Sequence, residues 1–104
     1  MTTVTTPLPQ WQVALARADE VRIARARLKR AIAAGERTVA EVLAEAPDYT
    51  ANMPVAELLQ AQHRWGRRRV MRLLNSLAIH ERRTVGRLTE RQKRAIIDAL
   101  GEAA

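Results

Sequence analysis

The sequence predicts an all-α fold in which a long N-terminal helix precedes a compact domain of about four short helices. Apolar residues make up 47% of the 104 residues, enough for a small core. They recur every three or four residues and nowhere alternate over a strand-length stretch. At this length we expect one domain, divided into a flexible segment over residues 1–9, a basic helix over 10–35 and a compact helical domain over 36–104.

The first helix is predicted to run from about Gln10 to Ala34, after a stiff segment that contains Pro7 and Pro9. Gly35 then stands where a helix-ending glycine belongs. Alanines dominate the first half of its apolar stripe, which predicts weak packing there, and Arg25 interrupts it. The apolar members of the stripe are Trp11, Ala14, Ala18, Val21, Leu28 and Ile32.

Two short helices are expected next. The capping box Thr38-Val39-Ala40-Glu41 opens the second helix, because a threonine hydroxyl and a glutamate carboxylate can each accept an orphan backbone N–H. Pro47 ends that helix. Pro54 suits the first turn of a third helix, which runs to about Gln62.

A tight turn over residues 63–66 leads to a fourth helix, from about Arg67 to Ser76. A short turn or helix over residues 81–85 follows, and Gly86 is expected to break it. A second capping box, Thr89-Glu90-Arg91-Gln92, opens the last helix, which runs to Leu100 and stops at Gly101. The expected core face of the fourth helix is Val70, Leu73, Leu74 and Leu77.

Positive charge is concentrated in one part of the chain. The net charge is +7, but residues 63–94 alone contain eleven Lys and Arg against two acidic residues, a net charge of +9. Residues 36–62 contain one arginine against five acidic residues, a net charge of −4. A dense basic segment of this kind indicates a nucleic-acid partner, and a solvated arginine-rich face is the plainer alternative.

Composition argues against several other classes. The chain has no cysteine and two histidines, too few residues for most metal sites or for thiol chemistry. Its four glycines form no phosphate-binding loop of the Walker or dinucleotide type, and three aromatic residues are few for a reader of single strands. We expect no enzyme activity, no cofactor, no metal, no membrane span and no signal peptide.

Two basic clusters are the candidate site. The first surrounds Gly66, where the start of a helix directs free N–H groups outward. Each arginine guanidinium there can bind two phosphate oxygens at once. The second follows one short helix later. Trp65, inside the first cluster, is either a wedge or platform for DNA or, more often in such domains, a cap on the core. The residues expected to bind DNA are Arg64, Trp65, Gly66, Arg67, Arg68, Arg69, Arg72, Arg82, Arg83 and Arg87, with secondary contacts from Arg22, Arg25, Lys29, Lys93 and Arg94.

The second half of the chain resembles the actinobacterial integration host factor family, which is unrelated to the heterodimeric factor of enteric bacteria. The resemblance lies in Met53–Leu59, Gly66–Arg69, Leu77–Val85, Leu88 and Gln92. It implies a long N-terminal helix, a helix–two-turns–helix core, and sequence-tolerant binding of duplex DNA through its phosphates. It also implies roles in nucleoid architecture, DNA bending and integrase-mediated recombination.

Residue by residue, the family turn Pro-Gly-Val-Gly-Lys-Val-Arg corresponds to residues 63–69. Gly66, Arg67 and Arg69 match and inherit the backbone-binding role that the resemblance implies, whereas His63 and Arg64 replace the proline and the first glycine. The family's second turn reads Arg-Arg-Val-Arg-Gly-Leu-Gly. There, Arg83, Val85 and Leu88 keep register, Thr84 and Gly86 replace arginines, and Arg82 and Arg87 restore charge one residue away.

The function we predict is that of an architectural, nucleoid-associated protein that binds double-stranded DNA, is cytoplasmic and acts as a monomer. The divergent turns suggest a distant, phage-encoded member that works with a site-specific recombinase. One alternative is an RNA-binding protein of the small ribosomal subunit, since ribosomal proteins of the S13 type also contain a helix–two-turns–helix motif. The other is a basic adaptor that docks an acidic recombinase or host regulator.

Overall fold

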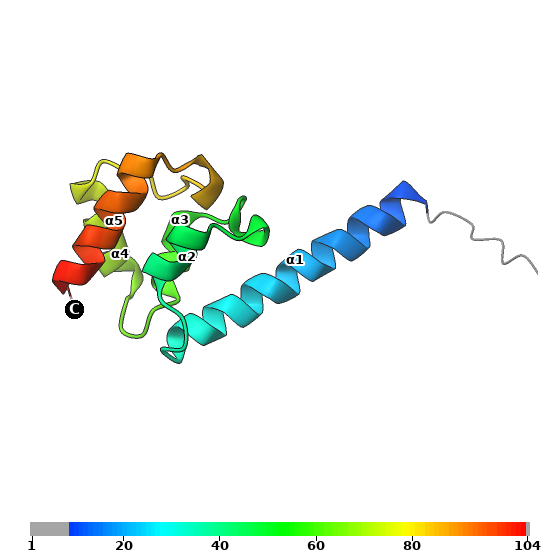
Figure 1. Ribbon diagram of the computed structural model, residues 1–104, viewed down its shortest axis with the longest axis horizontal. Helices are drawn as coiled ribbons and strands as arrows, with labels where there is room; N and C mark the ends of the chain where they lie inside the picture. Colours follow the sequence, from blue (N-terminus) through cyan, green and yellow to red (C-terminus); the bar gives the residue numbers. More distant parts are fainter. Residues whose placement is uncertain (1–8, 104) are drawn as a thin grey trace, which may run out of the picture.

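The computed structural model describes residues 9–103, and it confirms the all-α prediction (Figure 1). Within these residues there is no strand, only an isolated antiparallel bridge between Pro54 and Thr84. Most of the predicted flexible segment, residues 1–8, lies outside the described residues. The α-helices are α1 (Gln10–Ala33), α2 (Val39–Glu45), α3 (Val55–Gln60), α4 (Arg67–Ser76) and α5 (Glu90–Ala103), and the 3₁₀ helices are η1 (Asp48–Thr50) and η2 (Val85–Arg87).

The long helix α1 extends away from a body formed by the other helices, and its N-terminal end projects beyond that body (Figure 1). Leu28 and Ile32 are its only buried residues, whereas Trp11 and Leu15 are 66% and 57% exposed. The predicted weak packing of its first half is therefore confirmed. No helix over the described residues is both long and apolar enough to cross a membrane.

Gly35 ends α1 as predicted. Its φ of +79° lies in the left-handed region that glycine adopts at low cost. The N–H of Gly35 donates to the carbonyl of Ile32 at 3.1 Å, and the N–H of Glu36 donates to the carbonyl of Ala31 at 2.9 Å. This pair of bonds is the Schellman motif, which satisfies the last carbonyls of the helix.

The two capping boxes differ in completeness. At α2 the Thr38 hydroxyl accepts from the N–H of Glu41 at 3.1 Å, but the Glu41 carboxylate does not reach back, because it pairs with Arg37. At α5 both bonds form: Thr89 Oγ1 accepts from the Gln92 N–H at 3.1 Å, and Gln92 Oε1 accepts from the Thr89 N–H at 3.0 Å.

Helices α2, α3, α4 and α5 and the C-terminal end of α1 share one apolar core. The predicted core face of α4 is confirmed in part: Val70 and Leu74 are fully buried, while Leu73 and Leu77 pack at the edge. Arg67 to Ser76 is the helix that the sequence predicts, residue for residue. The fully buried side chains are Leu43, Met53, Leu58, Leu59, Leu74, Ile96, Val39, Val42, Val55, Val70, Val85 and Thr50.

Three helix boundaries differ from the prediction. Gly86 does not break a helix but lies in the middle of η2, and α5 continues through Gly101, whose backbone stays out of the left-handed region. A glycine within a helix lowers the stability of that helix by about 1 kcal/mol, which the rest of the fold can offset. A glycine ends a helix where its φ turns positive, and neither of these two glycines has a positive φ. Pro54 precedes the first turn of α3, and that helix ends at Gln60.

Candidate nucleic-acid interface

The turn before α4 and the exposed face of α4 bring the first basic cluster together. Because Val70 and Leu74 face the core, Arg68 and Arg72 project into solvent. A shallow groove runs along this face, lined by Arg67, Arg68, Met71, Arg72 and Asn75. The DNA-binding residues expected from the sequence include neither Met71 nor Asn75. Asn75 stands three residues after Arg72 and seven after Arg68, a helical spacing that could have indicated it.

Gly66 is the N-cap of α4, and nothing in the described part of the chain requires a glycine there. Its φ of −77° suits any residue, and a Cβ on it would meet no atom within 4 Å. No side chain caps this helix start, and the N–H groups of residues 67–69 donate to no acceptor in the described part of the chain. The glycine therefore leaves outward-pointing N–H groups open to a close-approaching anion.

Arg64 has a φ of +66°, in the left-handed region that non-glycine residues rarely adopt. The turn closes with a hydrogen bond from the Trp65 N–H to the Gln62 carbonyl at 3.1 Å. Arg64 stands where the resembled family has its first glycine, so the turn keeps a glycine-like backbone while it carries a cation. Such a conformation costs about 1–2 kcal/mol in a residue with a side chain.

Trp65 is half-buried and packs against the core. The Arg69 guanidinium lies 4.0 Å from the centroid of its ring, which is a cation–π contact. Of the two roles weighed from the sequence, this arrangement favours the structural one. The indole holds Arg69 against the body, and Arg69 itself stays exposed at the surface.

The two basic clusters meet at one ion pair. Arg67 Nη2 lies 3.2 Å from Glu81 Oε2, in side chains that are 71% and 31% exposed. Glu81 belongs to the loop that carries Arg82 and Arg83. The first arginine of α4 is therefore held beside the second cluster, and an anion that binds Arg67 lies close to the Glu81 carboxylate.

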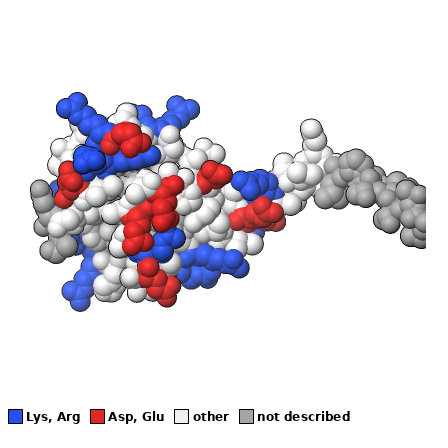
Figure 2. Space-filling view, in the orientation of Figure 1, with Lys and Arg blue, Asp and Glu red and all other residues white. Residues whose placement is uncertain are grey.

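The second cluster lies on a loop that is tied to the body. Main-chain bonds join it to residues 51–55: Val55 N–H to Arg83 O at 2.8 Å, Val85 N–H to Met53 O at 2.9 Å, and Gly86 N–H to Ala51 O at 2.9 Å. On the face shown in Figure 2, Lys and Arg gather along the upper edge, over η2 and the start of α5, and acidic side chains cross α2. The exposed arginines of this loop are Arg82, Arg83 and Arg87.

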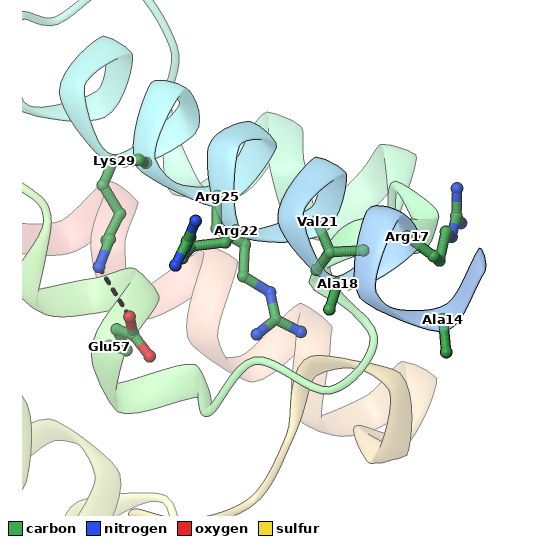
Figure 3. A pocket seen from close by; sticks show the side chains of 9 residues that line it. Ala14, Arg17, Ala18, Val21, Arg22, Arg25, Lys29 and Glu57 are labelled. Carbon is green, nitrogen blue, oxygen red and sulfur yellow. Dashed lines mark hydrogen bonds and ion pairs between the residues drawn. The ribbon is translucent and has the colours of Figure 1, made fainter. Parts of the chain in front are cut away.

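The residues predicted to make secondary contacts are mostly engaged within the chain. Arg22 pairs with Asp19 at 3.0 Å, Lys29 with Glu57 at 2.7 Å, and Lys93 with Glu90 at 3.5 Å, while Arg25 Nε donates to the Tyr49 carbonyl at 2.8 Å. Arg94 is exposed at the surface of α5. The structure thus places Arg22, Arg25 and Lys29 in a groove between α1 and α3 (Figure 3), which shares no lining residue with the groove on α4.

Comparison with known proteins finds a likeness to a solved structure. No protein-family model matches the chain, and no curated protein matches it. Among solved structures, the chain is similar to sIHF in its structure bound to an 8 bp palindromic DNA, with a TM-score of 0.76 and 24% sequence identity. The match covers 81% of this chain and 97% of that chain. The protein therefore shares the fold of sIHF.

Proposed function

We propose that this protein binds double-stranded DNA through its phosphate backbone, with little sequence preference, as a nucleoid-associated architectural protein of the integration host factor type. The observation that carries the proposal is the open N-terminal end of α4: unpartnered N–H groups behind Gly66, surrounded by exposed arginines. The likeness to sIHF, a protein solved with DNA bound, supports it.

The chemistry of this end of α4 fits phosphate in particular. Backbone N–H groups and the positive end of the helix dipole favour an anion, and arginine binds two phosphate oxygens at once. Contacts of this kind set the position of a protein on a duplex without reading bases. A second strand contact from Arg82, Arg83 and Arg87 would hold the duplex from another side and favour bending.

Further details of the proposal rest on the family resemblance. The protein binds DNA as a monomer. It acts in the cytoplasm, where it is associated with the nucleoid. The divergent residues of both turns fit a distant, phage-encoded member. A site-specific recombinase is the partner we propose for the DNA-bound protein.

A salt series of binding measurements tests the proposal. If about five to eight phosphates are neutralised, log K falls against log salt with a slope of about −5 to −7 on a duplex. Fluorescence anisotropy with duplex DNA, single-stranded DNA and structured RNA gives the slope and the ranking together. A slope near zero on duplex DNA contradicts the proposal, and a clear preference for structured RNA supports the ribosomal-type alternative instead.

A further inference from the structure

Residues 80–83 form the turn that carries the first two arginines of the second cluster. Before this turn, Ile79 is buried, and its N–H donates to the Leu74 carbonyl at 2.9 Å. At the end of the turn, the Arg83 carbonyl accepts from the Val55 N–H at 2.8 Å. The body therefore holds both ends of the turn, and the conformation between them depends on bonds within the turn itself.

His80 accepts both hydrogen bonds that close this turn. Its carbonyl accepts from the Arg83 N–H at 3.0 Å, which is the ordinary bond of a β-turn. Its side-chain Nδ1 accepts from the Arg82 N–H, also at 3.0 Å. Every residue has a carbonyl, but few side chains can accept from the N–H two residues further along the chain, and asparagine and aspartate are the common ones. The bond to Arg82 therefore depends on the identity of residue 80.

This bond also fixes which nitrogen of the imidazole carries the proton. A main-chain N–H can only donate, so Nδ1 of His80 has to be unprotonated, and the single ring proton of a neutral histidine then lies on Nε2. The His80 side chain is exposed, so burial in the core does not impose this arrangement. The histidine acts here as a hydrogen-bond acceptor at the surface of the protein.

Two charged residues stand on the main chain that this bond holds. Arg82 is exposed, and the Glu81 carboxylate reaches Arg67, with Oε2 at 3.2 Å from Nη2. Because the bond to His80 orders the main chain at Glu81 and Arg82, it also sets the direction in which each side chain leaves that chain. An arginine on an ordered main chain loses less conformational entropy when it binds a phosphate.

We propose that His80 is a positioning residue for DNA binding, whose Nδ1 holds the main chain of Arg82 so that the guanidinium is directed toward the phosphate backbone. The inference rests on the proposed function, because it concerns the second of the two DNA contacts. The fold does not require this bond, since main-chain bonds join residues 83–86 to residues 51–55 without His80. Loss of the His80 side chain should therefore lower DNA affinity and leave the fold in place.

Two substitutions at residue 80 test the role of Nδ1. His80→Ala removes the acceptor, whereas His80→Asn keeps one, because the asparagine Oδ1 is bonded to Cγ as the histidine Nδ1 is. His80→Ala should weaken duplex binding by about two- to tenfold, the usual effect of one lost hydrogen bond, and His80→Asn should stay within about twofold of the wild type.

Thermal unfolding of both variants accompanies the duplex titrations, and both midpoints should be close to that of the wild type. Three results overturn the proposal: His80→Ala binds like the wild type, His80→Asn binds as weakly as His80→Ala, or His80→Ala loses the fold. The second result would mean that the imidazole contacts DNA directly, and the third that His80 belongs to the fold.

A double-mutant cycle shows whether His80 acts through Arg82. In an Arg82→Ala background, His80→Ala should cause little further loss, because the guanidinium that it positions is absent. Arg87→Ala is the matched control, since it removes an arginine of the same cluster whose N–H donates to the Thr84 carbonyl. In that background, His80→Ala should keep its full effect of about two- to tenfold. Equal losses in the two backgrounds overturn the proposal.

NMR of the free, full-length chain separates this inference from the proposed function. At mildly alkaline pH, the ¹⁵N shifts of His80 should show an unprotonated Nδ1, and the Arg82 amide proton should exchange with solvent faster in His80→Ala than in His80→Asn. A proton on Nδ1, or equal exchange in the two variants, overturns the proposal without any DNA. If the wild type binds duplex DNA and His80→Ala binds as well, only the role of His80 fails. If the wild type does not bind duplex DNA, both the proposed function and this inference fail.

Discussion

The two basic turns look alike in sequence and differ in structure. Each contains a glycine among arginines, but Gly66 has open space where a Cβ would stand, whereas a Cβ on Gly86 would lie 2.8 Å from the Ala51 carbonyl oxygen. The first turn is free of tertiary contacts at its glycine, and the second is bonded to residues 51–53. The fold does not require a glycine at position 66, so the backbone there is open to a ligand. The fold does require a glycine at position 86, because the chain packs closely against it.

The largest expected effect comes from removing arginines at the open turn. Arg67→Ala with Arg69→Ala should weaken duplex binding by about 2–4 kcal/mol, since a hydrogen-bonded charge contributes about 1.5–3 kcal/mol. The slope of log K against log salt should become shallower by about 2. The loss of binding affinity should be similar on all DNA sequences. Arg27→Ala with Arg30→Ala removes the same charge from α1 and is the control. A loss confined to some sequences would indicate base reading instead.

Replacing Gly66 or Gly86 by serine tests the difference between the two turns. Gly86→Ser should destabilise the fold by about 1–3 kcal/mol, because the added side chain meets the main chain at Ala51. Gly66→Ser should retain or slightly raise stability, because serine is a good N-cap, yet weaken DNA binding by occupying the N–H groups of α4. Thermal unfolding and duplex titration of both variants give the result. Unchanged DNA affinity in Gly66→Ser would show that these N–H groups do not bind phosphate.

A smaller effect is expected at Arg64, whose backbone is left-handed. Arg64→Gly should raise stability by about 0.5–1 kcal/mol by relieving the unfavourable φ, while it lowers DNA affinity through loss of one charge. Arg64→Ala removes the same charge and keeps the strained backbone, so it should lower affinity equally without the gain in stability. Chemical denaturation separates the two variants, and equal stability would mean that the turn is not strained.

The smallest effect concerns the ion pair that joins the two turns. Glu81→Gln should strengthen duplex binding a few-fold, because it removes a negative charge beside Arg67 that repels phosphate. The cost in stability should be small, since exposed ion pairs contribute only about 0–1 kcal/mol. Glu36→Gln removes a carboxylate that pairs with no cation in the described part of the chain, and it controls for the change of net charge. If both variants bind alike, the Arg67–Glu81 pair has no specific role in binding.

Much of the fold followed from the sequence because its signals are local. The bounds of α4, the glycine at the end of α1 and the reciprocal cap of α5 each depend on residues within a few positions of one another. The failures lie at two glycines. Gly86 was expected to break a helix, but its N–H is bonded to the distant Ala51 carbonyl, and Gly101 was expected to stop α5, but its φ does not turn positive. Glu81 as the partner of Arg67 could not be predicted, since the two are 14 residues apart and only folding brings them together.

By itself the sequence determined that this is a basic, all-helical chain whose positive charge lies in residues 63–94, because helix periodicity and charge density are properties of neighbouring residues. Only the tertiary structure decided which glycine is open, which arginines already have partners, and which half of α1 the body covers. These depend on which segments pack together, and that packing brings residue 51 to residue 86 and residue 29 to residue 57.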